Sequence, residues 1–120
     1  KKKKKKIAGS KILIMGVAFK ENCPDSRNSK IFDTIKLLKK NGAKVFTYDP
    51  LVPIKFLRKK TNNILTRIKF SNYYDAVIIA VPHEEFLSLG ISKIKKIIKR
   101  DGLIFDLKSI FPKNKTDWQL

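Results

Sequence analysis

Apolar residues along the chain fall into short continuous runs separated by stretches with helical spacing. Short buried strands are predicted for four runs, which are Lys11–Met15, Ala43–Tyr48, Asp75–Val81 and Leu103–Leu107. The run "DAVIIAV" at 75–81 is apolar at nearly every position, which is typical of a parallel-sheet strand buried on both faces. The segment "NNILTRIKFSN" at 62–72 is ambiguous and is compatible with a short strand at Ile64–Lys69.

Helical patterns lie between these runs. Ile31, Ile35 and Leu38 recur at helical spacing and predict a helix that begins after Asn28 or Ser29 and ends near residue 41. Further helical segments are expected at Pro53–Lys60, at Glu84–Gly90 and at Ile91–Arg100, followed by a turn at Asp101-Gly102.

Strands that alternate with helical segments at a spacing of roughly 30 residues predict βαβ units. The sequence therefore predicts an α/β fold, a small Rossmann-like three-layer domain with a mainly parallel sheet over residues 11–120. Residues 1–10 are expected to form a basic lead-in or linker. Ligands of such sheets bind beyond the carboxyl ends of the strands. This rule selects four places, which are Gly16–Ser29, Asp49, Pro82–Glu84 and Lys108.

Composition narrows the class of protein. The chain has 120 residues, enough for one domain, and a formal charge of +18, of which the run Lys1–Lys6 supplies six. Nearly all other cations are lysines, whereas nucleic-acid readers favour arginine, so nucleic acid is not expected as the main partner. No apolar run approaches the about 20 residues that span a bilayer, so no membrane partner is expected. The single cysteine, Cys23, fits a reducing cytoplasm.

The loop "GVAFKENCPDSRNSK" after the first strand has a single glycine, Gly16. It lacks the three glycines of a dinucleotide-binding loop and also lacks the P-loop pattern. Lys20 and Arg27 could instead bind phosphate through their side chains. The alternatives are that Lys20 is one of many solvated lysines and that Arg27 pairs with Asp25 to brace the loop.

The remaining candidate residues have structural alternatives as well. Cys23 has no histidine near it in the sequence, so a small apolar filler is expected rather than a nucleophile. His83, the only histidine, could carry a proton or be structural, and with Cys23 it offers no cluster of metal ligands. Asp49 and Asp106 each end a strand, where turn formation is the default role.

Four segments carry a resemblance to a known family. "MGVAFKENCPDSRNSK", "GAKVFTYDP", "YYDAVIIAVPHEEF" and "IFDLKSIFPK…DWQL" resemble, in order and spacing, the C-terminal domain of the UDP-glucose/GDP-mannose dehydrogenase family. The resemblance covers about Lys11 to Leu120. The first loop and the ending "DWQL" are most similar to the bacterial UDP-N-acetylhexosamine 6-dehydrogenase branch, and the ending suggests a native C-terminus.

The resemblance implies an NAD-dependent oxidoreductase that converts a sugar C6 alcohol of a UDP-sugar into a carboxylate, as in uronic acid formation for surface polysaccharide. In the family, an N-terminal domain binds NAD, and a central domain carries the catalytic cysteine and lysine and the homodimer contact. The C-terminal domain closes over the nucleotide-sugar. The NAD-binding and catalytic segments are missing from this chain, so it is expected to be a fragment or a truncated product with no catalytic residue of its own.

The family's site residues carry over at four positions. The resemblance assigns nucleotide-sugar binding to Phe19 and Lys20 in the first loop and to Lys108 after the last predicted strand, where the UDP-glucose branch has arginine. It assigns an NAD contact to Arg27. Cys23 does not match the family's catalytic cysteine. Two other readings stay open, a non-enzymatic polyanion- or nucleic-acid-binding module and a stand-alone regulatory domain that binds a nucleotide.

Overall fold

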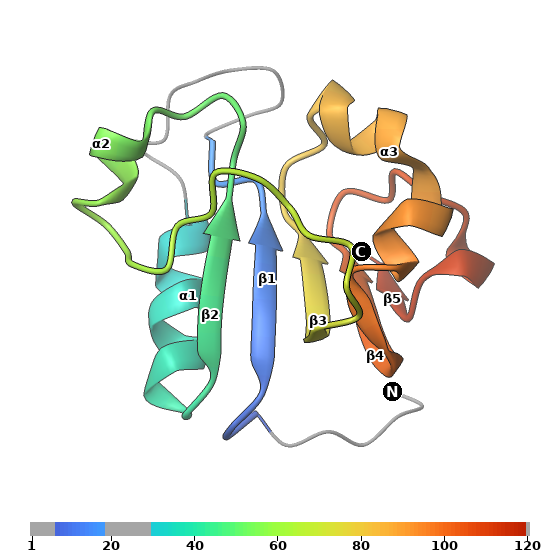
Figure 1. The fold of residues 1–120 in the computed structure, drawn as a ribbon, viewed down its shortest axis with the longest axis horizontal. Coiled ribbons are helices and arrows are strands. Elements are labelled where there is room, and N and C mark those ends of the chain that lie inside the picture. Colours follow the sequence, from blue (N-terminus) through green and yellow to red (C-terminus); the bar gives the residue numbers. More distant parts are fainter. Residues whose placement is uncertain (1–6, 19–29, 120) are drawn as a thin grey trace.

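The computed structural model describes residues 7–18 and 30–119, which form an α/β domain around one parallel sheet (Figure 1). The sheet has five strands in the order β2-β1-β3-β4-β5, and every neighbouring pair is parallel. The strands are β1 (Lys11–Met15), β2 (Lys44–Tyr48), β3 (Tyr74–Ile79), β4 (Ile98–Asp106) and β5 (Trp118–Gln119). The predicted α/β class with a parallel sheet is confirmed.

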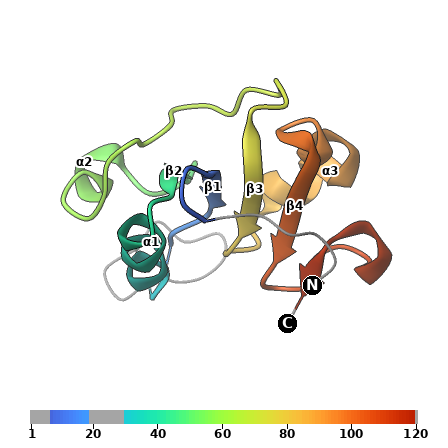
Figure 2. The same cartoon turned by 90° about the horizontal axis from the view of Figure 1, so that it is seen from below.

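Helices cover both faces of the sheet, because the strands are apolar on both sides. Helix α1 (Ile31–Lys40) and helix α3 (Glu84–Lys95) lie on opposite sides of it, as Figure 2 shows. Ile12 and Ile14 of β1 belong to the cluster on the α1 side, whereas Leu13 and Met15 belong to the cluster on the α3 side. A short helix, α2 (Ile54–Leu57), and a 3-10 turn, η1 (Lys113–Lys115), complete the described elements.

The α3–β4 region differs from the prediction. The two predicted helical segments are both present within α3, where they join across a kink at Gly90, which has a non-helical φ of 78°. The second segment ends at Lys95, because residues 98–100, which were predicted to be helical, are the first residues of β4. The strand β4 begins at Ile98 and passes through the predicted turn at Asp101-Gly102. The turn prediction was wrong because the chain forms a bulge there without leaving the ladder. The register on β3 moves from Tyr74↔Ile98 to Ala76↔Leu103 across it.

Two further details depart from the sequence prediction. The segment 62–72 forms only an isolated bridge, Thr47↔Ile64, along the edge of β2, so the strand considered for 64–69 does not form. The strand β5 was not predicted, because two residues are too few for a periodic pattern. Asn28 and Ser29, the predicted caps of α1, lie outside the described residues. None of the helices in 7–18 and 30–119 is long and apolar enough to cross a membrane.

Candidate functional site

Three loops meet where β1, β2 and β3 end, at the top edge of the sheet in Figure 1. The residues that they contribute are Gly16–Ala18 after β1, Asp49 after β2 and His83, which lies between β3 and α3. Because β1 lies between β2 and β3, the start of its loop is flanked by the other two. We call this group of residues the strand-end site.

Asp49 joins the three loops through one carboxylate oxygen. Its Oδ2 accepts hydrogen bonds from the backbone N–H groups of Val17 (2.8 Å) and Ala18 (3.0 Å). His83 Nε2 lies 3.0 Å from the same oxygen, and its side chain is 1% exposed. Asp49, in the loop after β2, therefore fixes both the backbone of the loop after β1 and the side chain of His83 after β3.

The second oxygen of Asp49 shapes its own loop. Its Oδ1 accepts the backbone N–H groups of Leu51 (2.8 Å) and Val52 (3.2 Å). The predicted role of Asp49 in a turn is thus confirmed. Its hydrogen bonds to the loop after β1 and to His83 were not predicted. Both oxygens of this buried carboxylate are engaged, so Asp49 organises the site rather than offering a group to a ligand.

Asp49 stays ionised although its side chain is buried. Loss of solvent alone would raise the pKa of Asp49, but hydrogen bonds from His83, Val17 and Leu51, together with the charge of His83, lower it below 3.8. A buried carboxylate with several N–H donors is stable as the anion. The geometry therefore favours a structural role for His83, as the side-chain partner of this anion.

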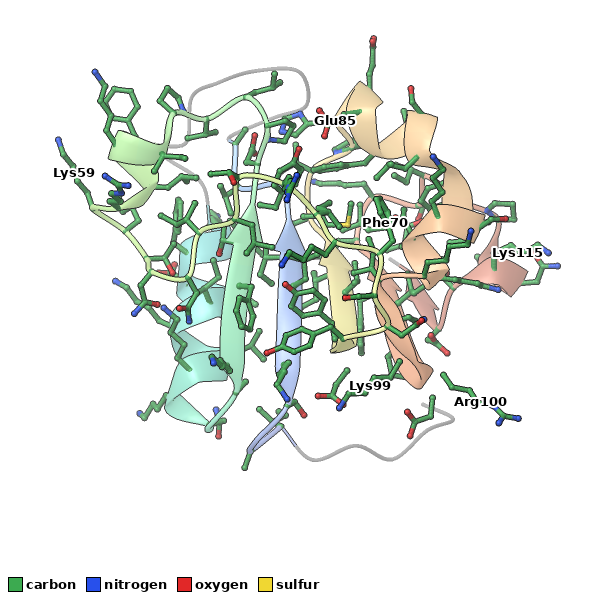
Figure 3. The ribbon with its side chains drawn as sticks, viewed as in Figure 1. Lys59, Phe70, Glu85, Lys99, Arg100 and Lys115 are labelled. Carbon is green, nitrogen blue, oxygen red and sulfur yellow. The ribbon has the colours of Figure 1, made fainter. Side chains whose placement is uncertain are left out.

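A second cross-link runs beside the first. The Tyr48 hydroxyl, at the end of β2, donates a hydrogen bond to Glu85 Oε2 (2.6 Å) near the start of α3. Burial, the hydrogen bond to Glu85 and the nearby charges of Glu85 and Asp49 raise the pKa of Tyr48, so its hydroxyl stays protonated as the donor. Figure 3 shows Glu85 at this edge of the molecule. The β3–α3 turn is thus tied to the end of β2 at two points.

The single glycine of the first loop has a steric reason. Gly16 has a φ of +96°, and a Cβ on it would lie 2.7 Å from the Cβ of Val81. Its N–H donates to the carbonyl oxygen of Tyr48 (2.9 Å). Only glycine fits where the end of β1 approaches the chain after β3 so closely.

The loop after β4 is organised by its own aspartate. Asp106 Oδ1 and Oδ2 accept the backbone N–H groups of Ile110 (3.1 Å) and Phe111 (2.9 Å), which confirms its predicted role in a turn. Lys108 is exposed on this turn, two residues after the end of β4. Its side chain forms no hydrogen bond or ion pair with another described residue, so its ammonium group is available to an anion.

The other predicted site residues cannot be placed. Phe19, Lys20 and Arg27, and also Cys23, lie outside the described residues, so their assignments stay predictions. Within the described ranges, no group of three or more His, Cys, Asp or Glu side chains could hold a metal ion.

The described residues do not fit a dinucleotide. In dinucleotide-binding domains an acidic residue about 20 positions after the glycine loop binds the ribose hydroxyls, at the end of the second strand. Asp49 ends the second strand here, but its side chain is buried and both its oxygens accept backbone N–H groups.

Comparisons with known proteins identify a family and relatives for this chain. Residues 13–113 match the family model described as "UDP-glucose/GDP-mannose dehydrogenase family, UDP binding domain". A UDP-N-acetyl-D-glucosamine 6-dehydrogenase of Salmonella typhi is 39% identical over 114 residues, which are 95% of this chain and 27% of that protein. The enzyme of the same name from Pseudomonas aeruginosa is 33% identical over the same shares of the two chains.

Solved structures show the same fold. A UDP-D-ManNAc dehydrogenase of Pyrococcus horikoshii superposes with a TM-score of 0.71 at 25% identity, over 95% of this chain and 26% of that one. An NDP-N-acetyl-D-galactosaminuronic acid dehydrogenase of Methanosarcina mazei gives a TM-score of 0.75 at 26% identity, over 92% and 23% of the two chains.

This chain spans about a quarter of the length of the relatives that it matches. The match runs from the middle of β1 to the first residue of η1 and takes in all three loops of the strand-end site. The resemblance found in the sequence is confirmed, including its similarity to UDP-N-acetylhexosamine 6-dehydrogenases. The chain belongs to the UDP-glucose/GDP-mannose dehydrogenase family, in which it matches the UDP binding domain.

Proposed function

We propose that this chain is the nucleotide-sugar-binding domain of an NAD-dependent UDP-sugar 6-dehydrogenase, which oxidises the sugar C6 alcohol to a carboxylate. The observation that carries the proposal is the match of residues 13–113 to a UDP binding domain, together with relatives named as UDP-N-acetyl-D-glucosamine 6-dehydrogenases. Uronic acid formation for surface polysaccharide in the cytoplasm of a bacterium is the setting that fits such an enzyme.

The strand-end site supports this function by its position and its rigidity. Ligands of doubly wound sheets bind at this edge, and the hydrogen bonds of Asp49 fix the backbone of Val17 and Ala18. The sequence continues directly from Ala18 into Phe19 and Lys20, the residues that we propose to contact the nucleotide-sugar. Lys108 is proposed as a further cation for this ligand, because it is exposed after β4 at the same edge.

We further propose that NAD is bound mainly by an N-terminal domain of the same enzyme, that a central domain supplies the catalytic cysteine and lysine, and that the enzyme is a homodimer. Arg27 is proposed to reach NAD across the cleft between domains. The absence of a fit for a dinucleotide among the described residues supports this division of roles.

The test is a calorimetric titration of the chain with UDP and, separately, with duplex DNA at physiological salt. We expect saturable UDP binding that Lys108→Ala and Lys20→Ala each weaken by about ten- to a hundredfold, since hydrogen bonds to charged groups contribute roughly 1.5–3 kcal/mol. Lys36→Ala, on the exposed side of α1, is the control and should bind UDP as the parent does. Salt-sensitive DNA binding without UDP binding would favour a polyanion-binding module instead.

A further inference from the structure

The start of β4 carries a structure that the proposed function does not use. Between Ile98 and Leu103 the register of β4 against β3 shifts, and Lys99 and Arg100 lie within this bulge. Gly102 closes it, because a Cβ on Gly102 would lie 2.7 Å from the Cβ of Ile98 and 3.0 Å from the carbonyl oxygen of Lys99. Bulges of this kind redirect side chains and are frequent beside functional sites.

A cavity of about 290 Å³ lies against this bulge. Its walls come from the end of α3, from the bulge and from the segment Asn114–Asp117. This segment is held against β4, because Ile104 N–H donates to Asp117 Oδ2 (2.8 Å) and Asp117 N–H donates to the Ile104 carbonyl oxygen (2.9 Å). Lys99 and Arg100 are the second and third residues of β4. The cavity therefore lies at the amino end of this strand, at the edge of the sheet opposite to the strand-end site.

The lining of the cavity is strongly cationic. Lys95, Lys99, Arg100 and Lys115 contribute positive charge, and Asp117 is the acidic residue of the lining. Figure 3 shows Arg100 and Lys115 extending outward on the same side of the molecule. Lys99 is paired with Asp75, its Nζ lying 3.2 Å from Asp75 Oδ1. Lys95, Arg100 and Lys115 form no ion pair with any residue in 7–18 or 30–119.

Polar groups without charge add to the lining. Asn114 contributes a side-chain amide, and Thr116 lines the same cavity. Thr116 Oγ1 is buried and has no hydrogen-bond partner among the described residues. Buried hydroxyl groups are rarely left in this condition, so the fold retains an unused hydrogen-bonding group at this wall.

The geometry points to a second anion-binding site in this cavity, for a small phosphate-class anion. An arginine fork, ammonium groups and an amide match phosphoryl oxygens, and arginine can bind two of them at once. The volume is at the lower end of the roughly 300–1,000 Å³ of ligand pockets, which suits an inorganic phosphate or pyrophosphate rather than a whole nucleotide-sugar.

The test is a titration of the isotope-labelled chain with inorganic pyrophosphate at a constant ionic strength of about 0.15 M, followed by NMR. We expect saturable shifts of the backbone signals of residues 99–102 and 114–117. They should persist when UDP is present in excess, because UDP is expected at the opposite edge of the sheet. The double variant Arg100→Gln/Lys115→Gln should weaken this binding about tenfold or more, since it removes two charge-assisted contacts.

A matched double variant, Lys36→Gln/Lys40→Gln, removes the same charge from the exposed side of α1 and should leave the affinity unchanged within about twofold. Equal weakening by both double variants would overturn the proposal, because the attraction would then be a general effect of net charge. Absence of shifts at residues 99–102 in the parent chain would overturn it as well. The first variant should still bind UDP, so failure of this site and failure of the proposed function give different results.

Discussion

At Asp49, a buried carboxylate accepts backbone N–H groups from two loops and faces the imidazole of His83. Replacing Asp49 by Asn keeps the shape but puts an N–H group where these donors need an acceptor. We expect Asp49→Asn to lower the free energy of unfolding by about 2–4 kcal/mol, because buried N–H groups lose their partner. Urea unfolding measures this value.

The control for this substitution is Asp33→Asn. Asp33 is exposed in the first turn of α1, where its interaction with the helix dipole contributes less than about 1 kcal/mol. If both variants lose the same small amount of unfolding free energy, the hydrogen bonds of Asp49 do not stabilise the three loops of the strand-end site.

Asp49 also predicts a pH dependence. Its pKa in the folded chain is below the ordinary value of 3.8, so its contribution to stability is complete above that value and is lost as the pH falls through the folded pKa. The difference in unfolding free energy between the parent and Asp49→Asn should therefore shrink from about pH 5 to about pH 2. Urea titrations at several pH values check this, and a difference that stays constant would contradict it.

Sequence reasoning reached the right residues at this scale but not their partners. Asp49 and His83 stood out because each follows a predicted strand. Their pairing spans 34 positions, and it became visible only when the strand order placed β1 between β2 and β3. A strand-end aspartate followed by a histidine after the next parallel strand is a pattern from which such a pair can be suspected.

At the scale of elements, His83 connects the end of β2 to the turn between β3 and α3. His83→Leu removes the side-chain partner of the Asp49 anion, and we expect a loss of about 1–3 kcal/mol in unfolding free energy. His83→Gln can place an N–H donor near the position of Nε2, so it should recover a measurable part of that loss. Urea unfolding of both variants decides the matter, and equal losses would mean that packing against Phe86, not the hydrogen bond, is what His83 contributes.

The elements that could be predicted are those with a clear apolar period. The helix α1 and the strands β1, β2 and β3 follow from their patterns, because each buries a continuous stripe or run. The bulge in β4 could not be predicted, since Asp101-Gly102 is equally typical of a turn, and only pairing with β3 keeps it in the sheet. The strand β5 is formed by pairing alone. The kink at Gly90, in contrast, agrees with the sequence, because one predicted helical segment ends at Gly90 and the next begins at Ile91.

At the scale of the whole molecule, the chain spans about a quarter of its relatives, and its described residues offer no fit for a dinucleotide. We therefore expect no NADH when the 120-residue chain is incubated with NAD and UDP-N-acetyl-D-glucosamine. A full-length relative under the same conditions is the positive control. NADH formation above the blank without protein would contradict the proposed division of roles among the domains.

The central place of β1 has a further consequence, for folding. Its partners follow it in the chain, and the hydrogen bond from the Lys11 N–H to the side chain of Asp75, in β3, spans 64 positions. Parallel sheets with such distant pairings fold slowly and leave apolar strands such as "KILIM" unpaired for longer. Lysines stand at the first positions of β1 and β2, and the net charge of +18 makes unfolded chains repel one another.

This predicts that the yield of refolding from urea falls, and aggregates rise, as salt increases from about 0.05 M to about 0.5 M and screens that repulsion. Light scattering during dilution measures the aggregates, and a yield that does not depend on salt would contradict the prediction. The surplus of lysine then acts before the domain exists, as the electrostatic barrier that keeps partly folded chains from joining strand to strand.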